Sequence, residues 1–189
     1  MTSEFYLVDP LDGTREFISR NGEFTVNIAL VRDGVPVAGV VYAPALSKLY
    51  AGEQASGAFQ LQVSATHPYP DEPVFETIRC PELPTANFKV VASRSHRDEK
   101  TDNWLAERDV AEIVAAGSSL KFCLLASGQA HLYPRFGRTM EWDTAAGHAV
   151  LAAAGGEVFE AGGEALRYGK ANRGFDNPAF IASVSAQGF

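Results

Sequence analysis

The stretch from residue 24 to residue 63 constrains the fold most, because it has the pattern of consecutive antiparallel strands. Apolar residues alternate with other residues from Phe24 to Val31, which is typical of a strand with one buried face. Asp33-Gly34 follows, a pair that favours a two-residue hairpin turn. Further strands are predicted over residues 35–42, 48–51 and 58–63. We therefore expect an antiparallel meander in the first half of the chain.

The second half of the chain has a different pattern. Short apolar strands are predicted at residues 88–92, 111–116 and 131–133, and helices at residues 97–108, 118–127 and 144–154. Strands that alternate with helices favour a layered α/β arrangement. The stretch from residue 64 to residue 87 is rich in Pro, Thr and Glu, and we interpret it as a connection. It divides the chain into a first part, 1–85, and a second part, 86–189.

Composition limits the class of protein. The chain has 189 residues, 46% of them hydrophobic, which suits a globular protein with a core. Its net charge of −7 argues against binding to nucleic acid polymers, but not against a nucleotide accompanied by cations. Two cysteines, Cys80 and Cys123, are too few for a disulfide framework.

We find no leader sequence and no apolar run long enough to cross a bilayer. The expected location is therefore the cytoplasm, without stable membrane insertion; peripheral contact with the inner membrane stays open.

Three carboxylates are candidates for metal binding. An apolar strand ends in Asp9-Pro10-Leu11-Asp12-Gly13-Thr14, and the proline forces a turn, because it fixes φ and has no N–H. We expect this turn to bring the carboxylates of Asp9 and Asp12 and the Leu11 carbonyl to one side. Far downstream, Asp143 stands just before a predicted helix. Mg²⁺ prefers oxygen ligands, and carboxylates beside free backbone N–H groups suit metal-assisted phosphate hydrolysis.

Each of these residues also has a simpler interpretation. Asp9 and Asp12 could form a turn and a helix cap, and Asp143 could cap the helix that follows it. Thr14 starts a short helix predicted through Ile18, where it could be an ordinary cap. The free N–H groups at that helix start also attract anions, and Gly13 leaves room for a phosphate. Taken alone, the residues leave both interpretations open.

These motifs resemble those of the inositol monophosphatase superfamily of magnesium-dependent, lithium-sensitive phosphatases. The resemblance rests on D-P-L-D-G-T-x-E-F from residue 9 and W-D-x-A-A-G from residue 142, with supporting stretches at residues 20–27, 93–96 and 117–123. The resemblance runs from residue 4 almost to the end of the chain. Within the superfamily, the sequence is most similar to the branch of 3′(2′),5′-bisphosphate nucleotidases. The resemblance implies an α-β-α-β-α sandwich with the active site between the two halves.

The resemblance also implies a role for each candidate residue. Asp9 would bridge two magnesium ions, the Leu11 carbonyl would bind one and Asp12 the other, and Asp143 would be a further ligand. Thr14 would orient the attacking water. The substrate-binding set would comprise Leu11, Asp12, Gly13, Thr14, His96, Ser118, Lys121, Arg135 and Asp143.

Within that set, Lys121 is unusual in the residues themselves. It falls in the first turn of its predicted helix, where a cation opposes the helix dipole and an anionic partner would account for it. By resemblance, Lys121, Ser118, Arg135 and His96 would hold the ribose or the non-scissile phosphate. Their simpler roles are a helix cap for Ser118, a surface cation for Arg135 and a solvent-facing loop residue for His96.

Glu16, Glu23 and Glu141 are expected to be surface or supporting carboxylates.

The implied reaction removes the 3′-phosphate of adenosine 3′,5′-bisphosphate, in sulfur assimilation and nucleotide recycling. One alternative is an inositol or sugar monophosphatase. Glu16 before Phe17 favours the nucleotidase, because the inositol branch usually has Asn there. The other alternative is a catalytically silent chain that binds cation or nucleotide weakly and pairs with another chain.

The chain departs from the family at its start. Family members carry a further N-terminal segment, which supplies a glutamate ligand and an acidic partner for the threonine-bound water. Neither has a counterpart here, and nothing marks Glu4 as a replacement. We therefore expect an N-terminally incomplete sandwich with weak or no activity, and an uncovered apolar sheet face that promotes self-association.

Overall fold

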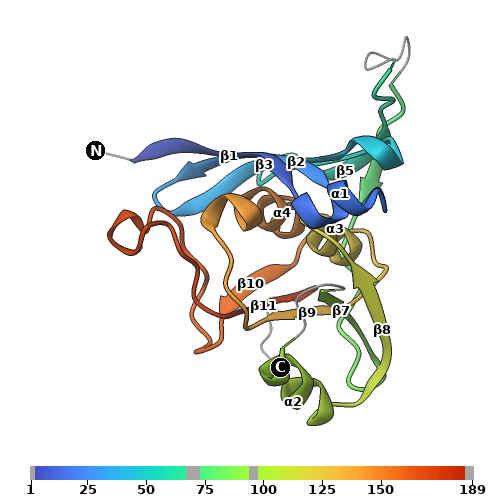
Figure 1. The fold of residues 1–189 in the computed structure, drawn as a ribbon, viewed down its shortest axis with the longest axis vertical. Coiled ribbons are helices and arrows are strands. Elements are labelled where there is room, and N and C mark those ends of the chain that lie inside the picture. Colours follow the sequence, from blue (N-terminus) through green and yellow to red (C-terminus); the bar gives the residue numbers. More distant parts are fainter. Residues whose placement is uncertain (1–2, 67–72, 94–97, 186–189) are drawn as a thin grey trace.

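The computed structural model describes residues 3–66, 73–93 and 98–185, and its strands form two sheets (Figure 1). The first sheet is antiparallel, in the order β1-β2-β3-β4-β5-β6. Its strands are β1 (Glu4–Asp12), β2 (Thr25–Arg32), β3 (Val35–Ala43), β4 (Lys48–Glu53), β5 (Gly57–Gln62) and β6 (Glu76–Ile78). The second sheet has the order β10-β11-β9-β7-β8, and β7 is parallel to both of its neighbours. Its strands are β7 (Phe88–Ser93), β8 (Val110–Ala116), β9 (Leu132–Arg135), β10 (Glu157–Glu160) and β11 (Phe180–Ser183).

The predicted meander is confirmed in the first sheet. β2 and β3 are joined by Asp33-Gly34, with φ of 50° and 76°, and a type I′ hairpin turn requires this left-handed conformation at both positions. β6 was not predicted. It is a three-residue strand inside the stretch that we expected to be a connection, and its pairing with β5 decides its conformation more than any local pattern.

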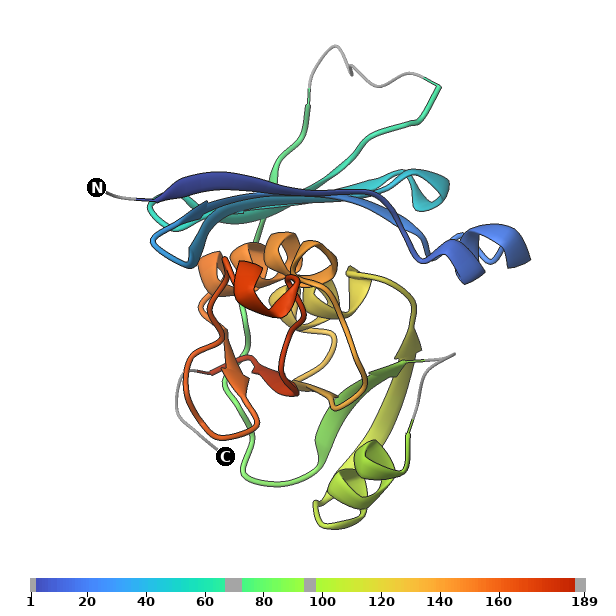
Figure 2. The same cartoon turned by 60° about the vertical axis from the view of Figure 1, so that its left-hand side comes forward.

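Two helices, α3 (Leu120–Ala126) and α4 (Glu141–Ala153), lie between the sheets (Figure 2). Helix α4 packs against β2, β3 and β4 of the first sheet. A Cβ atom at Gly39 would lie 2.5 Å from the carbonyl oxygen of Ala146, and one at Gly52 would lie 2.8 Å from Cβ of Ala153. Because no side chain fits at that separation, the two glycines allow the helix to lie directly on the sheet.

The remaining helices are α1 (Thr14–Ser19) and α2 (Glu99–Ala106), with two short 3₁₀ segments, η1 (Pro44–Leu46) and η2 (Ala171–Arg173). α2 packs beneath the second sheet through Trp104 and Leu105, which contact Val90 and Leu132. Along the part of the chain that is described, no helix has both the length and the apolar character that crossing a bilayer requires.

The mixed α/β class is confirmed, as sheet, helices, sheet and helix in successive layers (Figure 2). One apolar core joins Val41 of the first sheet, Leu151 of α4 and Phe180 of the second sheet. The other face of the first sheet carries Tyr6 and Val8, which are 68% and 51% exposed. No helix among the described residues packs on that face.

Candidate functional site

Asp9 and Asp12 lie at the end of β1, where the strand is irregular. The pairing of β1 with β2 shifts register between these two residues, which is the signature of a bulge. The N–H of Leu11 donates a hydrogen bond to Oδ1 of Asp9 at 3.0 Å, inside the bulge. We expected Pro10 to end the strand in a turn. Instead pairing resumes at Asp12, because a bulge accommodates a residue that cannot donate to the ladder.

Helix α1 begins at Thr14, as predicted, directly after Gly13. Gly13 has φ of 85°, a conformation that favours glycine, and its carbonyl accepts the N–H of Phe17 at 2.9 Å. A Cβ atom there would lie 3.3 Å from Cβ of Ser118. The glycine therefore brings the β1–α1 turn close to the segment that leads into α3.

Asp143 lies inside the first turn of α4, not before it. The helix begins at Glu141, three residues earlier than predicted. Oδ2 of Asp143 accepts a hydrogen bond from the N–H of Met140 at 2.7 Å, so the residue caps its helix. Because a carboxylate has two oxygens, capping leaves Asp143 able to bind a cation as well.

The structure brings the three predicted carboxylates together. Asp9, Asp12 and Asp143 each offer an oxygen, and these oxygens all lie within 4.8 Å of one another. Burial raises the pKa of Asp143 to about 6, and the charges of Asp12 and Asp9 add to the rise. Burial likewise raises the pKa of Asp9 above its usual value. A divalent cation among these oxygens would relieve the repulsion, and hard carboxylate donors suit Mg²⁺.

A cleft of about 340 Å³ adjoins these carboxylates and carries both signs of charge. Asp12 and Asp143 line it together with the predicted substrate residues Gly13, Thr14, Ser118, Lys121 and Arg135. His96 lies outside the described residues. Sequence reasoning did not assign a role to the cleft residues Arg15 and Arg138, because each resembles an ordinary surface cation in the sequence.

Lys121 occupies the first turn of α3, as predicted, and is only 6% exposed. Its ammonium group donates to the carbonyl oxygen of Ser118 at 2.6 Å and lies 5.5 Å from the centre of the Tyr133 ring. Burial lowers the pKa of Lys121 to about 8, whereas the negative charge of Asp12 acts in the opposite direction and raises this pKa. An anion entering the cleft would therefore meet a poorly solvated cation.

The three remaining glutamates lie in or beside the site, and Glu16 lines the cleft directly. Glu141 is completely buried, and its carboxylate accepts the N–H groups of Gly169 at 2.8 Å and Lys170 at 2.9 Å. Glu16 is 6% exposed, and Oε2 of Glu23 accepts the N–H of Gly117 at 2.9 Å. These contacts agree with a supporting role for Glu141 and Glu23.

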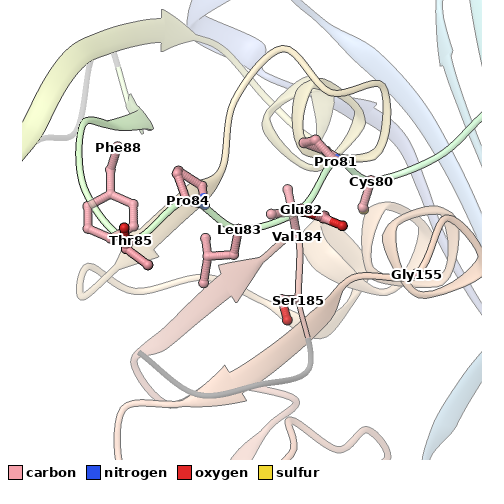
Figure 3. Close-up of a pocket in the computed structure, with 10 residues that line it drawn as sticks. All are labelled: Cys80, Pro81, Glu82, Leu83, Pro84, Thr85, Phe88, Gly155, Val184 and Ser185. Carbon is pink, nitrogen blue, oxygen red and sulfur yellow. The ribbon is translucent and has the colours of Figure 1, made fainter.

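A larger cavity, of about 730 Å³, lies away from the carboxylates, between residues 80–85 and the end of β11 (Figure 3). Among its lining residues, Glu82 is the acidic side chain and Cys80 the thiol. Burial raises the pKa of Cys80 to about 12, so this thiol stays protonated and unreactive at neutral pH. With one carboxylate and no cluster of reactive groups, this cavity lacks the chemistry that the smaller cleft contains.

Comparison with known proteins gives the same family from sequence and from structure. The sequence model of the inositol monophosphatase family matches residues 2–186. The 3′(2′),5′-bisphosphate nucleotidase CysQ of Escherichia coli is 46% identical, over 95% of this chain and 68% of its own length.

Solved structures agree with the sequence comparisons. The crystal structure of CysQ from Bacteroides thetaiotaomicron superposes with a TM-score of 0.86 at 44% identity, over 98% of this chain and 71% of that one. An IMPase of Thermotoga maritima superposes with a TM-score of 0.74 at 25% identity, over 97% of this chain and 65% of that one. The family resemblance noted from the sequence is thereby confirmed.

Proposed function

The chain belongs to the inositol monophosphatase family of metal-dependent enzymes, and from this premise we propose that it is a magnesium-dependent 3′(2′),5′-bisphosphate nucleotidase. Its substrate would be adenosine 3′,5′-bisphosphate, from which it removes the 3′-phosphate. The observation that carries the proposal is the clustering of Asp9, Asp12 and Asp143 within 4.8 Å, beside a cleft that also holds Lys121 and Arg135. The cleft therefore combines groups that suit cations with groups that suit an anion.

Asp9, Asp12, Asp143 and the Leu11 carbonyl are the proposed ligands of two or more Mg²⁺ ions, with inhibition by Li⁺ as part of the proposal. Bound Mg²⁺ would neutralise phosphate charge and lower the pKa of a coordinated water. The chain's own contribution is to hold the reacting groups in place. Thr14 lines the cleft and would offer its hydroxyl to orient the attacking water, and Gly13 leaves room for the phosphate beside the backbone.

The second part of the chain would hold the rest of the nucleotide. Ser118, Lys121 and Arg135 line the cleft, and we assign to them, with His96, the ribose and the non-scissile phosphate. In this proposal residues 1–85 supply the metal loop and residues 86–189 supply the nucleotide-binding elements. Positively charged side chains in the cleft are expected when the substrate has a second phosphate, since Mg²⁺ already neutralises the first.

Partners and location complete the proposal. Both cysteines are free thiols, which suits the reducing cytoplasm. The exposed apolar side chains Tyr6, Val8 and Ile28 on the outer face of the first sheet favour self-association, and the net charge of −7 disfavours nucleic acid polymers.

The proposal is tested by phosphate release from adenosine 3′,5′-bisphosphate, inositol 1-phosphate and a sugar monophosphate, with Mg²⁺ and with EDTA. We expect weak release from the bisphosphate with Mg²⁺, loss of that release with EDTA, and its inhibition by Li⁺. A preference for inositol 1-phosphate would replace the nucleotidase by the monophosphatase alternative. Release that persists in EDTA would contradict the metal site.

A further inference from the structure

We propose that Ser119 and Asn27 are positioning residues that hold Asp12 in register with Asp143 and thereby set the cation affinity of the site. This inference rests on the proposed function, because it concerns the same carboxylates. Neither residue belongs to the proposed ligand set. Both lie behind the carboxylates, where Ser119 is 1% exposed and Asn27 is fully buried.

Ser119 contacts both carboxylate-bearing segments. Asp12 lies on β1 and Asp143 on α4, two elements that are far apart in sequence. The N–H of Ser119 donates to Oδ2 of Asp12 at 2.7 Å, and its hydroxyl lies 2.7 Å from the carbonyl oxygen of Asp143. One residue at the start of α3 therefore sets the position of a side chain in the first sheet relative to the backbone of a helix beneath it.

Asn27 completes the link from the neighbouring strand β2. Its amide nitrogen lies 3.3 Å from Oδ2 of Asp12 and 2.9 Å from the hydroxyl oxygen of Ser119. The hydroxyl of Thr25 makes a longer contact, 3.4 Å, with the same carboxylate oxygen. Every hydrogen bond that the Asp12 carboxylate accepts from the described residues ends on Oδ2. The other oxygen, Oδ1, remains available for a cation.

The protons available match these contacts. The hydroxyl of Ser119 has one proton, which goes to the nearer acceptor, the carbonyl of Asp143, and its lone pair accepts one proton of the Asn27 amide. The second amide proton and the N–H of Ser119 go to Oδ2 of Asp12. The network is therefore satisfied on the side that faces the carboxylates.

The other side of the Asn27 amide points to the role of this residue. Its Oδ1 is buried without a hydrogen-bond partner among the described residues, and such an oxygen costs stability. Reversing the amide would place this carbonyl against the negative oxygen of Asp12. The next inward positions of the same strand are the apolar residues Ala29 and Val31. An apolar residue at position 27 would serve the core better, so the amide is better explained by Asp12 than by packing.

The test replaces the two residues separately and measures cation binding without substrate. The variants are Ser119→Ala and Asn27→Leu. The matched control is Ser127→Ala, which removes a serine hydroxyl that bonds the carbonyl of Cys123 at 2.7 Å just after the far end of α3. The probe is Mn²⁺, titrated into each purified chain while free Mn²⁺ is followed by electron paramagnetic resonance. We expect Mn²⁺ to bind about 10- to 100-fold more weakly in both variants, which is the usual effect of removing a supporting partner of a metal ligand. The Mn²⁺ affinity of the control should be unchanged.

Thermal unfolding in EDTA separates positioning from a general loss of folding. We expect Asn27→Leu to keep or raise its Tm while it loses Mn²⁺ affinity, because the unpartnered carbonyl is gone. Wild-type Mn²⁺ affinity in both variants would overturn the inference and leave the proposed function intact. Parallel losses of Tm and affinity in both variants would also overturn it, in favour of a purely structural role. Failure of the unmodified chain to bind Mn²⁺ would overturn the proposed function itself, and this inference with it.

Discussion

The ammonium group of Lys170 lies 2.8 Å from a carboxylate oxygen of Glu141, whose side chain is completely buried. The same carboxylate accepts the backbone N–H groups of Gly169 and Lys170. This contact ties the loop after β10 to the start of α4, two residues before Asp143.

Glu141→Ala should therefore destabilise the fold strongly, because it leaves two N–H groups without their acceptor and removes the carboxylate that neutralises the Lys170 ammonium group. We expect the free energy of unfolding to fall by about 3–5 kcal/mol, measured by urea denaturation. The control is Glu4→Ala, which breaks the half-exposed ion pair between Glu4 and Arg32. Exposed pairs contribute less than about 1 kcal/mol, so equal losses in the two variants would contradict the prediction.

Replacing a proposed metal ligand should remove activity while the fold persists. We expect Asp12→Asn and Asp143→Asn each to lower turnover of adenosine 3′,5′-bisphosphate by at least ~10²-fold, since metal-based charge stabilisation supplies several kcal/mol. Asp102→Asn on α2 is the control and should retain turnover. Full turnover in either site variant would exclude that carboxylate from the metal site.

Lys121→Met should distinguish the nucleotide-binding role of the cleft from its metal-binding role, since it removes the charge and keeps a side chain of similar length. We expect KM for adenosine 3′,5′-bisphosphate to rise about 10-fold or more, the loss of one charge-assisted hydrogen bond, with a smaller change for a monophosphate. The control is Lys89→Met, where the lysine pairs with Glu112 on the surface. Equal changes for both substrates would remove the specificity argument.

The raised pKa of Asp143 has a consequence for stability. Its folded pKa of about 6 lies above the ordinary value of 3.8, so the folded chain binds more protons than the unfolded chain between these values. The stabilising contribution of protonated Asp143 is then fully present below pH 3.8 and is lost as pH rises through about 6. As pH rises from 3.8 to about 6 in EDTA, we expect the Tm to fall by less in Asp143→Asn than in the unmodified chain. Identical pH profiles would show that Asp143 does not titrate there.

The exposed apolar face of the first sheet should promote association of the chain with itself. Tyr6→Lys places a charge on that face along its edge strand β1 and should shift the mass in sedimentation velocity toward the monomer. Ile18→Lys is the control, because Ile18 is 74% exposed on α1, outside the sheet face. A mass unaffected by Tyr6→Lys would exclude this face as the contact.

Parts of the fold could be predicted because their determinants are local. Alternation from Phe24 to Val31 and the hairpin preference of Asp33-Gly34 act within one hairpin, and both predictions are confirmed by β2 (Thr25–Arg32) and its turn. The end of α4 before Gly155 is another local signal. β6, β10 and β11 lack such signals, because their pairing depends on partners distant in sequence. The start of α4 was placed three residues late for a similar reason: burial of Glu141 against Lys170 stabilises its first turn.

For the site, the residue types alone show which side chains have the right chemistry. Asp9, Asp12 and Asp143 are oxygen donors, and Gly13-Thr14 follows a strand in the pattern of a helix start. How these groups come together depends on the packing of the folded chain. The bulge in β1, the glycine contacts that seat α4 on the first sheet, and the bridge through Ser119 between Asp12 and Asp143 all join segments from different parts of the chain. Their distances depend on packing and buried hydrogen bonds, which no local pattern of residues specifies.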